Sequence, residues 1–571
     1  MMDSQRPFLY ITLIFIGFLL WMNWQNDYNS PQPTAVETTE NGSTSTGVAT
    51  DNSVPEQPES GSPVAPNDTQ QAASKDNEQL IQVRTDVLEL QISTRGGDIV
   101  VADLPTYPVS LEEPDNPVRI LNWEDEAYAA QSGLLVRSNG GEGKRAPTHQ
   151  DIFTAAKSEY VLQEGEDTLR VPLTWTSDDG VTVTKVYSFR RGQFAVGMEQ
   201  LVQNNSEQSW AGTEYRQLQH GPAPPAPGGF LTSGVRAFVG GAYYVDDAYK
   251  KVSFDDMVDG VATETIDGVT RSKVVTGGWV SMLEHYFISA WVAPRDAQTR
   301  YFSKEIGNQL SKRYILGMYS DQVKLAPGES GSFNSTLWVG PKLQDDLEAI
   351  AEGLDLTVDY GIFAFISKPI FWVMQWIHSI VGNWGWTIIF LTLLIKLIFF
   401  WPSAASYKSM AKMKAVAPRL KELNERYSDD PQAKQKAMME IYRKEKINPL
   451  GGCLPILIQI PVFMGLYWVL LESVELRQAP WLLWYKDLSI RDPYFVLPII
   501  MGASMFVQQK LNPPPADPMQ QKIFQFLPLI FTVMFLWFPA GLVLYWVVNN
   551  ILSIAQQWFI NNKIVGKPKT E

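Results

Sequence analysis

The feature that most constrains this chain is a set of apolar segments long enough to cross a bilayer, and residues 384–401 form the clearest one. This segment reads WGWTIIFLTLLIKLIFFW and has tryptophan at both ends, where lipid meets water. It contains one charged residue, Lys396, with Thr392 four residues earlier and therefore on the same helical face. A charged residue inside a span raises the free energy of membrane insertion by at least about 2.5–3.5 kcal/mol. Such a residue usually faces the interior of a helix bundle or a water-filled cavity. The alternative is that the lysine side chain extends to the headgroups near Trp401.

Further apolar segments of similar length occur at residues 7–24, 454–471, 494–511, 523–538 and 542–560. Together with the first segment they predict a multi-domain membrane protein with an α-helical bundle of six spans and both termini in the cytoplasm. This arrangement keeps the basic loops on the inner side. Arg6 precedes the first segment and no small-residue cleavage signal follows it, so we expect an uncleaved anchor rather than a removed signal peptide.

Residues 360–381 are also long enough to cross the bilayer, but Lys368 and Pro369 interrupt them. If this segment crossed, residues 407–446, with eleven lysines and arginines, would lie outside, against the usual placement of basic loops. We therefore expect residues 360–381 to lie along the outer surface as an amphipathic helix.

The long region between the first two spans is predicted to lie outside the cytoplasm. Residues 25–78 are rich in Ser, Thr, Pro, Asn and Gln, and they predict a disordered linker. Residues 79–342 contain many short alternating segments with Gly and Pro turns, which predict a large all-β sandwich. Residues 343–354 predict a short acidic helix, and the acidic surplus behind the formal net charge of −14 belongs to the exterior region.

Several strands of this sandwich can be placed. Alternation is clear at residues 83–94, and further strands are expected at residues 282–292 and 331–339. The clearest hairpin joins residues 171–176 to residues 181–189, because the Asp-Gly pair just before the second strand supplies the residues that a tight turn needs.

The basic segment, residues 407–447, predicts a helical hairpin. Apolar residues recur every three or four positions from Met413 to Tyr427, and Asp430 followed by Pro431 predicts the capped start of a second helix. Basic residues occupy the outer faces of both helices, among them Lys408, Lys412, Lys414, Arg419, Lys421, Arg443 and Lys444. Their charge fits either simple attraction to headgroups or a docking platform for an acidic partner such as ribosomal RNA or a nascent chain.

Common catalytic chemistry has little support in the sequence. The single cysteine, Cys453, excludes an intramolecular disulfide, and no HExxH, phosphate-binding loop or GxSxG occurs in a supporting context. In the β region, His220 is expected beside a proline-rich loop at residues 221–229, and His149 in another loop. Neither has an evident acid or base partner in sequence. A binding or spacer module is therefore expected there rather than an enzyme.

The spans offer no Asp or Glu partner for Lys396 and no repeat symmetry, which argues against an ion-coupled transporter. Their polar residues could instead line a hydrated pocket open to the cytoplasm, namely Thr392, Lys396, Gln459, Gln508, Gln509, Asn549 and Asn550. A positive wet pocket would lower the barrier for a short polar or acidic segment that enters the bilayer.

Long stretches of the C-terminal region resemble the YidC/Oxa/Alb family of membrane protein insertases. These stretches are SMAKMKAVAPRLKELNERYSDD (409–430), INPLGGCLPILIQIPVFMGLYWVL (447–470), SVELRQAPW (473–481), DPMQQKI (517–523) and FLWFPAGLVLYWVVNN (535–550). The large exterior β domain is similar to that of Gram-negative members, in a weaker and mostly architectural match.

The resemblance implies insertion and folding of inner-membrane proteins, alone or with the Sec translocon, through a positively charged groove open to cytoplasm and lipid. It places Lys396, Thr392, Gln459 and Trp546 at groove positions, and Ile460, Pro461 and Met534 on substrate-contacting helices. The implied partners are nascent inner-membrane proteins, the Sec translocon, the ribosome, the targeting-factor receptor and lipids. Insertion of this kind is expected to need no nucleotide, metal or other cofactor.

Two positions depart from the family pattern. Bacterial members usually have arginine where Lys396 stands, and lysine keeps the charge but loses the planar fork of the guanidinium. Trp546 stands where tyrosine is common, so a phenolic hydroxyl is not expected from that position.

The expected organisation begins with an anchor (1–24), a linker (25–78) and a periplasmic β-sandwich (79–342). A linking segment (343–383), an insertase core (384–563) with its cytoplasmic hairpin (407–447), and a tail (564–571) follow. Two other functions remain open at this point: a solute transporter or channel with a tethered periplasmic binding domain, and a sugar-processing enzyme on a membrane tether.

Overall fold

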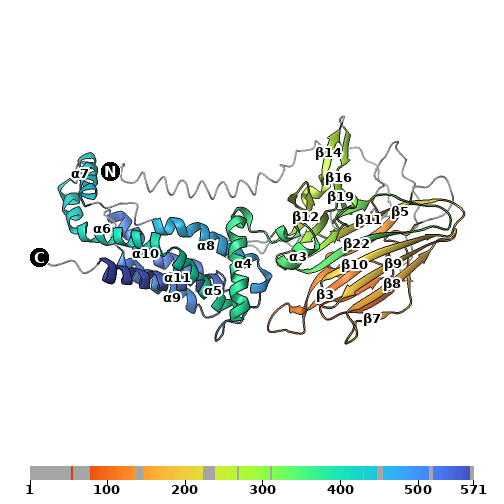
Figure 1. Ribbon diagram of the computed structural model, residues 1–571, viewed down its shortest axis with the longest axis horizontal. Coiled ribbons are helices and arrows are strands. Elements are labelled where there is room, and N and C mark those ends of the chain that lie inside the picture. Colours follow the sequence, from red (N-terminus) through yellow and green to blue (C-terminus); the bar gives the residue numbers. More distant parts are fainter. Residues whose placement is uncertain are drawn as a thin grey trace. The chain divides into compact units, whose positions relative to one another are not determined.

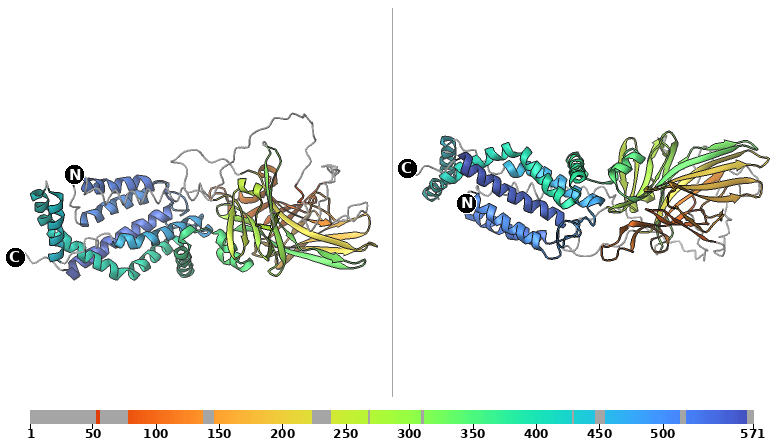
Figure 2. Two further views of the ribbon diagram at one scale, coloured as in Figure 1. Left: turned by 90° about the horizontal axis from the view of Figure 1, so that it is seen from above. Right: turned by 60° about the horizontal axis from the view of Figure 1, so that its bottom comes forward.

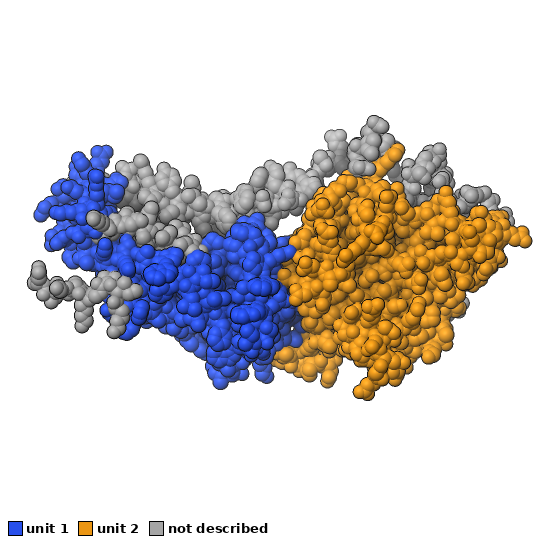
Figure 3. Space-filling view, viewed as in Figure 1, with its two compact units in different colours: residues 1–31, 359–571 blue, residues 32–358 orange. Residues whose placement is uncertain are grey.

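A computed structural model describes residues 53–55, 78–136, 146–222, 238–266, 269–308, 311–427, 430–445, 454–512 and 518–565. The chain divides into two compact units, one of them Gln32–Val358 and the other Met1–Pro31 with Asp359–Glu571 (Figure 3). The expected anchor at 7–24, nearly all of the linker at 25–78 and most of the tail at 564–571 lie outside the described residues.

The unit Gln32–Val358, orange in Figure 3, is built from β-strands (Figure 1). Its strands are β1 (Leu80–Arg84), β2 (Glu89–Ser93), β3 (Ile99–Pro108), β4 (Pro117–Asn122), β5 (Ala129–Val136), β6 (Thr154–Ala155), β7 (Glu159–Val161), β8 (Thr168–Thr176), β9 (Val181–Arg190), β10 (Ala195–Asn204), β11 (Trp210–His220), β12 (Gly240–Val245), β13 (Ala248–Val252), β14 (Thr263–Ile266), β15 (Val269–Ser272), β16 (Val274–Thr276), β17 (Trp279–Leu283), β18 (Phe287–Val292), β19 (Gln298–Ile306), β20 (Arg313–Ser320), β21 (Val323–Leu325) and β22 (Ser330–Pro341). Its short helices are α2 (Trp123–Glu126), η2 (Asp255–Asp259), α3 (Gln344–Ile350) and η3 (Leu354–Thr357).

Two large sheets form the predicted sandwich. Within the described residues, an 11-stranded sheet has the order β16-β19-β20-β11-β5-β3-β2-β1-β7, with β21 on β11 and β4 on β3. A 9-stranded sheet has the order β13-β12-β17-β18-β22-β10-β9-β8-β6. The main core contains residues of both sheets, such as Leu218 of β11 and Trp291 of β18, so the sheets pack face to face.

The predicted strands are present, but two of them are hairpins. The hairpin of β8 and β9 pairs Thr176 with Thr182, as its turn signal predicts. Residues 83–94, expected as one strand, turn back between β1 and β2, and the Thr85 hydroxyl accepts a hydrogen bond from the Leu88 N–H at 3.0 Å. Residues 282–292 likewise form the ends of β17 and β18 with a turn at Glu284. Apolar residues stand close to both turns, and neither turn contains the Gly or Pro that usually marks one, which is why the sequence pattern misses them.

Residues 53–55 of the linker are held against the β domain by hydrogen bonds. Ser53 is buried against the β domain, and its backbone oxygen accepts from the Gln217 side chain of β11 at 3.2 Å. The Val54 oxygen accepts from the Lys304 ammonium at 3.0 Å. At these residues the linker is therefore part of the folded domain, in contrast to the disordered tether that the sequence predicts.

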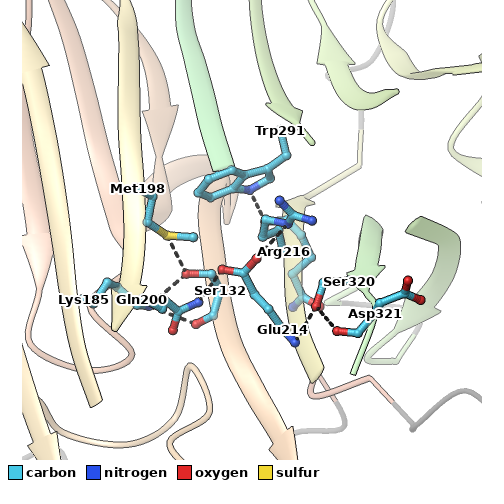
Figure 4. A network of polar contacts seen from close by, with 10 residues as sticks. Ser132, Lys185, Met198, Gln200, Glu214, Arg216, Trp291, Ser320 and Asp321 are labelled. Carbon is cyan, nitrogen blue, oxygen red and sulfur yellow. Dashed lines mark hydrogen bonds and ion pairs between the residues drawn. The ribbon is translucent and has the colours of Figure 1, made fainter. Parts of the chain in front are cut away.

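A buried lysine crosses the sandwich. Lys185 of β9 donates from Nζ to the Gly96 oxygen at 2.5 Å. It also donates to the Ser132 oxygen and hydroxyl, at 3.1 and 2.9 Å (Figure 4). Burial lowers the pKa of Lys185 to about 8, although the charge of Asp98 opposes this shift. Burial also raises the pKa of Asp98, which accepts from the Ser132 N–H, to about 7. The lysine thus links β9 of one sheet to β5 of the other.

A second buried charge pair lies beside it on β11. The side chains of Glu214 and Arg216 are both 1% exposed, with Arg216 Nε 3.4 Å from Glu214 Oε2. Gln200 of β10 donates to the other carboxylate oxygen at 2.7 Å (Figure 4). Buried charges cost free energy unless they are paired, so these contacts select one arrangement of the two sheets.

The other unit, blue in Figure 3, is helical in its described part. Its elements are η4 (Gly361–Phe363), α4 (Ala364–Val381), α5 (Trp384–Ile398), α6 (Phe400–Arg426), α7 (Pro431–Lys444), α8 (Leu454–Glu472), η6 (Val474–Leu476), α9 (Val496–Leu511), α10 (Pro518–Phe535), α11 (Ala540–Phe559) and η7 (Ile560–Val565). Helix α11 packs against α5 and α9, α10 packs against α9, and α4 packs against α8 and α5. In Figures 1 and 2, α4 runs across the direction of the other bundle helices.

Helix α5 ends earlier than the sequence predicts. The apolar segment at 384–401 was expected to be one helix, but α5 stops at Ile398 and α6 starts at Phe400. Pro402 explains the break, because its ring would clash with the carbonyl of Ile398 and it has no N–H to donate. By length and composition alone, among the described helices only the bent pair Trp384–Ile398 and Phe400–Leu420, with 68° between them, passes as a membrane span.

The basic segment forms the expected hairpin of α6 and α7. The Asp430 side chain accepts from the N–H groups of Gln432 and Ala433, both at 3.0 Å, and Pro431 follows at the first helical position. Val416 and Leu420 of α6 are buried against apolar residues that include Ile441 of α7. The stripe that begins at Met413 is therefore the contact face of the hairpin.

We expect Lys185→Met to lower the free energy of unfolding of a fragment containing residues 53–358 by about 3–5 kcal/mol, because it leaves Asp98 and two carbonyls buried without their partner. Asp98→Asn should be milder, and the double variant should lose less than the sum. Urea unfolding measures these changes. Lys324→Met, at an exposed lysine of β21, is the matched control and should stay within about 0.5 kcal/mol of the wild type. Equal stability of the Lys185 and Lys324 variants would contradict a linking role.

Candidate functional site

The candidate site is built on one face of α11. Tyr545, Asn549 and Ser553 recur at intervals of four residues, so they form a line along the helix. All three are buried in the bundle. Inside an apolar bundle such polar groups require partners from neighbouring helices, and the described contacts supply them from α5 and α8.

Lys396 of α5 points toward this line. Its Nζ donates to the Ser553 hydroxyl at 2.7 Å, and Ser553 in turn donates to the Asn549 backbone oxygen at 2.7 Å. The lysine side chain is partly exposed rather than sealed in the bundle. In this structure the ammonium therefore faces α11 and does not extend along α5 toward Trp401.

Thr392 lies one turn before Lys396 and is buried. Its hydroxyl donates to the Ile388 oxygen of its own helix at 2.6 Å. The Thr392 hydroxyl thus satisfies its hydrogen bond within its own helix, on the same helical face as the lysine.

Gln459 of α8 contacts the same line of polar residues on α11, at Asn549 and Tyr545. Its amide nitrogen lies within hydrogen-bonding distance of the Asn549 side-chain oxygen, and 3.4 Å from the Tyr545 hydroxyl. The structure therefore brings Gln459 and Lys396, from α8 and α5, onto one polar line. Tyr545 and Ser553 were not among the residues predicted from the sequence, although their spacing of four from Asn549 was a signal for them.

Trp546 follows Tyr545 and takes a different role. Its ring packs edge-on against Phe463 of α8, with centroids 5.1 Å apart, and against Phe535 of α10, at 5.8 Å. Trp546 thus supplies aromatic bulk between α8 and α10. The phenolic hydroxyl near Gln459 comes instead from Tyr545.

The residues assigned to substrate-contacting helices lie on α8 and α10. Ile460 of α8 is 48% exposed and Met534 of α10 is 40% exposed. Pro461 lies inside α8 and is partly exposed. Successive helical residues point about 100° apart, so Ile460 presents a different face from Gln459.

The hairpin presents the expected charges. Its exposed basic side chains include Lys408, Lys412, Lys414, Arg419, Arg443 and Lys444. Lys421 lies within α6, but its side chain is outside the described part of the structure. Arg419 pairs with Glu445 at 3.1 Å, which leaves most of this cationic surface uncompensated by the described acidic residues.

The two histidines of the β domain differ in their surroundings. The ring nitrogens of His149 lie 2.6 Å from the Tyr215 hydroxyl and 2.7 Å from the Ser53 hydroxyl, which fixes the ring between two folded segments. His220 is buried at the end of β11, where burial lowers its pKa. Two carboxyl groups, of Glu126 and Glu284, lie beside it. The sequence could not show this, because these residues are far apart along the chain.

Comparison with known proteins identifies both units. The family model described as YidC periplasmic domain matches residues 80–373, and the one described as 60Kd inner membrane protein matches residues 376–567. Proteins named membrane protein insertase YidC are similar along their whole length. The one from Thioalkalivibrio sulfidiphilus (strain HL-EbGR7) is 52% identical over 568 residues, covering 99% of each chain. The one from Methylococcus capsulatus (strain ATCC 33009 / NCIMB 11132 / Bath) is 48% identical over 564 residues, again covering 99% of each.

These matches define a bacterial inner-membrane protein with a periplasmic domain. The chain belongs to the YidC family. A solved structure described as an active YidC insertase with its first transmembrane domain resolved matches 84% of this chain and 94% of that one, at 16% identity and a TM-score of 0.36.

Proposed function

We propose that this chain is a membrane protein insertase and chaperone of the bacterial inner membrane, acting on nascent inner-membrane proteins. Full-length similarity to proteins named as insertases supports this function. The main structural support for the mechanism is the Lys396 ammonium, which points toward the line of polar residues on α11 and donates to Ser553. We infer no enzymatic activity for this chain.

The proposed topology has six spans, with both termini in the cytoplasm and residues 79–342 in the periplasm. The spans would be residues 7–24, α5, α8, α9, α10 and α11. The hairpin of α6 and α7 would then lie in the cytoplasm, as its basic charge favours. The linker at 25–78 and the segment at 343–383 would connect the periplasmic domain to the membrane on either side.

Helix α4 fits a position on the outer membrane surface. One face is buried, with Phe371 and Met374 among its members, and the Ser367 hydroxyl on that face donates to the Gly465 oxygen of α8 at 3.0 Å. The opposite face exposes large apolar residues, namely Phe365, Trp372, Trp376 and Ile380. A helix with an exposed aromatic stripe, lying across the bundle helices, suits the lipid–water boundary.

The polar line would form the inner wall of a hydrated groove open to the cytoplasm and to lipid. Lys396 would attract acidic residues of a client's polar tail, while Thr392 and Gln459 keep the wall polar. The hydrophobic segment of the client would then move into lipid along α8 and α10, past Ile460, Pro461 and Met534. Transfer of apolar surface from water into lipid drives this step, so no nucleotide or metal is required.

The cationic hairpin would recruit acidic partners at the cytoplasmic side. We propose the ribosome and the targeting-factor receptor as partners there, and the Sec translocon as a partner within the membrane. The exposed lysines and arginines of α6 and α7 support a contact of this kind, because clustered positive charge speeds the approach of acidic surfaces. The same charges would also hold the hairpin near anionic lipids.

The charge of Lys396 can be tested by replacing it in a strain depleted of its own insertase. Lys396→Arg should support growth and insertion, because it keeps the positive charge, whereas Lys396→Glu should reduce insertion severely. Lys486→Glu, at an exposed loop position between α8 and α9, makes the same charge change and should be tolerated. Normal insertion by the Lys396→Glu protein would rule out an attractive role for this charge.

The proposed exit path predicts where a client is contacted. Photo-crosslinking residues placed at positions 396, 460 and 534 should capture a stalled nascent membrane protein. Position 499 of α9 is the matched control, because Ile499 is 60% exposed but lies outside α8 and α10. Capture at 499 as strong as at 460 and 534 would contradict a path along those two helices.

The hairpin's role can be measured by ribosome co-sedimentation with the detergent-solubilised protein. Replacing Lys408, Lys412 and Lys414 by glutamate should weaken binding at least about tenfold at low salt, with a smaller difference at high salt. The same replacement at Lys250, Lys251 and Lys324, which are exposed lysines of the β domain, controls for net charge. If both triple variants bind ribosomes equally well, the hairpin is not the docking surface.

A further inference from the structure

A cluster of possible metal ligands lies in the β domain, away from the proposed groove. Glu126 is the last residue of α2, His220 the last residue of β11, and Glu284 lies in the turn between β17 and β18. One ligand atom from each side chain can be chosen so that all three lie within 4.8 Å of one another. Small side-chain rotations would bring such atoms to the spacing found around a bound divalent ion.

The His220 ring is held in an orientation suited to metal binding. Its Nδ1 lies 2.7 Å from the Gly221 oxygen, so this nitrogen carries the hydrogen and donates it. The lone pair is then left on Nε2, the nitrogen that a metal requires. The rings of Tyr128 and Phe254 lie 4.3 and 5.2 Å from the imidazole, centroid to centroid, and restrict its rotation.

The backbone also brings the ligands together. The Gly221 N–H donates to the Glu126 backbone oxygen at 2.7 Å, which ties the end of β11 to the end of α2. A Cβ at position 221 would lie only 2.6 Å from that oxygen, so this approach requires glycine. The Glu284 N–H donates to the Phe287 oxygen at 3.0 Å and closes the turn that carries the third ligand.

The surroundings of the two carboxyl groups disfavour their charged forms in the absence of a nearby cation. Burial and then the charge of Glu126 raise the pKa of Glu284 to about 8, and burial and then the charge of Asp125 raise the pKa of Glu126. The buried Lys342 opposes the shift of Glu284. Glu126 is exposed whereas His220 is buried, so the cluster can be reached from solvent on one side.

We propose that Glu126, His220 and Glu284 form a binding site for Zn²⁺ in the periplasmic domain. One imidazole nitrogen and two carboxylates are ligands that zinc accepts, and the fourth position would be open to water on the Glu126 side. Bound zinc would join the end of α2, the end of β11 and the turn between β17 and β18. Because a metal that binds only the folded state stabilises it, the domain's unfolding temperature should rise with zinc.

The test uses the untagged full chain in detergent after removal of metal by chelation. Equilibrium dialysis against Zn²⁺ should give one ion per chain, and Co²⁺ in its place should give the visible absorption of a protein-bound ion. His220→Gln and Glu126→Gln should each weaken zinc binding at least about tenfold and remove the cobalt absorption. Glu126 is exposed, so its variant tests the site without disturbing the core.

His285→Gln is the matched control, because His285 follows Glu284 directly but stacks on Tyr286, with ring centroids 3.9 Å apart. Zinc should raise the unfolding temperature of the wild type and the His285 variant, and not that of the His220 variant. Absence of stoichiometric binding by the wild-type chain would overturn the proposal. Unchanged binding by both His220→Gln and Glu126→Gln would overturn it as well.

Discussion

The helical unit depends on how a few polar side chains satisfy one another among apolar helices. Ser553 accepts from Lys396 and donates to the backbone of α11, and Asn549 pairs with Gln459. Each unpaired polar group in a lipid environment would cost several kcal/mol, so these contacts constrain how α5, α8 and α11 pack. The same contacts leave the ammonium partly exposed, which is the condition that the proposed groove needs.

A proline and a glycine fix the two ends of α5, the helix that carries Lys396. Pro402 ends α5 just after Lys396, and α6, the first helix of the basic hairpin, then continues at an angle of 68° to α5. At the other end, the glycine at 385 allows close packing, because a Cβ there would lie 2.1 Å from the Trp481 ring. The Asn383 side chain caps α5 and also donates to the Pro480 oxygen at 2.9 Å. The helix that carries the lysine is therefore fixed at both ends.

Much of the helical unit could be predicted because its signals are local. The apolar runs give the limits of α8, α9 and α11 within about two residues, and the Asp-Pro pair gives the start of α7. The bend after Ile398 was missed because apolar composition continues through it, although Pro402 was visible. The contact of Lys396 with Ser553 depends on how two helices rotate against each other, and no local pattern contains that information. The cluster around His220 joins residues separated by up to 158 positions, which is also beyond local patterns.

The strand order of the sandwich has a consequence for how the exported chain reaches its native state. β5 pairs with β11, β11 with β20, and β10 with β22, so neither sheet is complete until residues beyond 313 have been delivered. Pairings between strands so far apart in sequence form late and slowly. The early strands would therefore wait in the periplasm with open edges, exposed to aggregation and proteolysis. For a protein that assists the assembly of others, its own exterior half would be slow to fold.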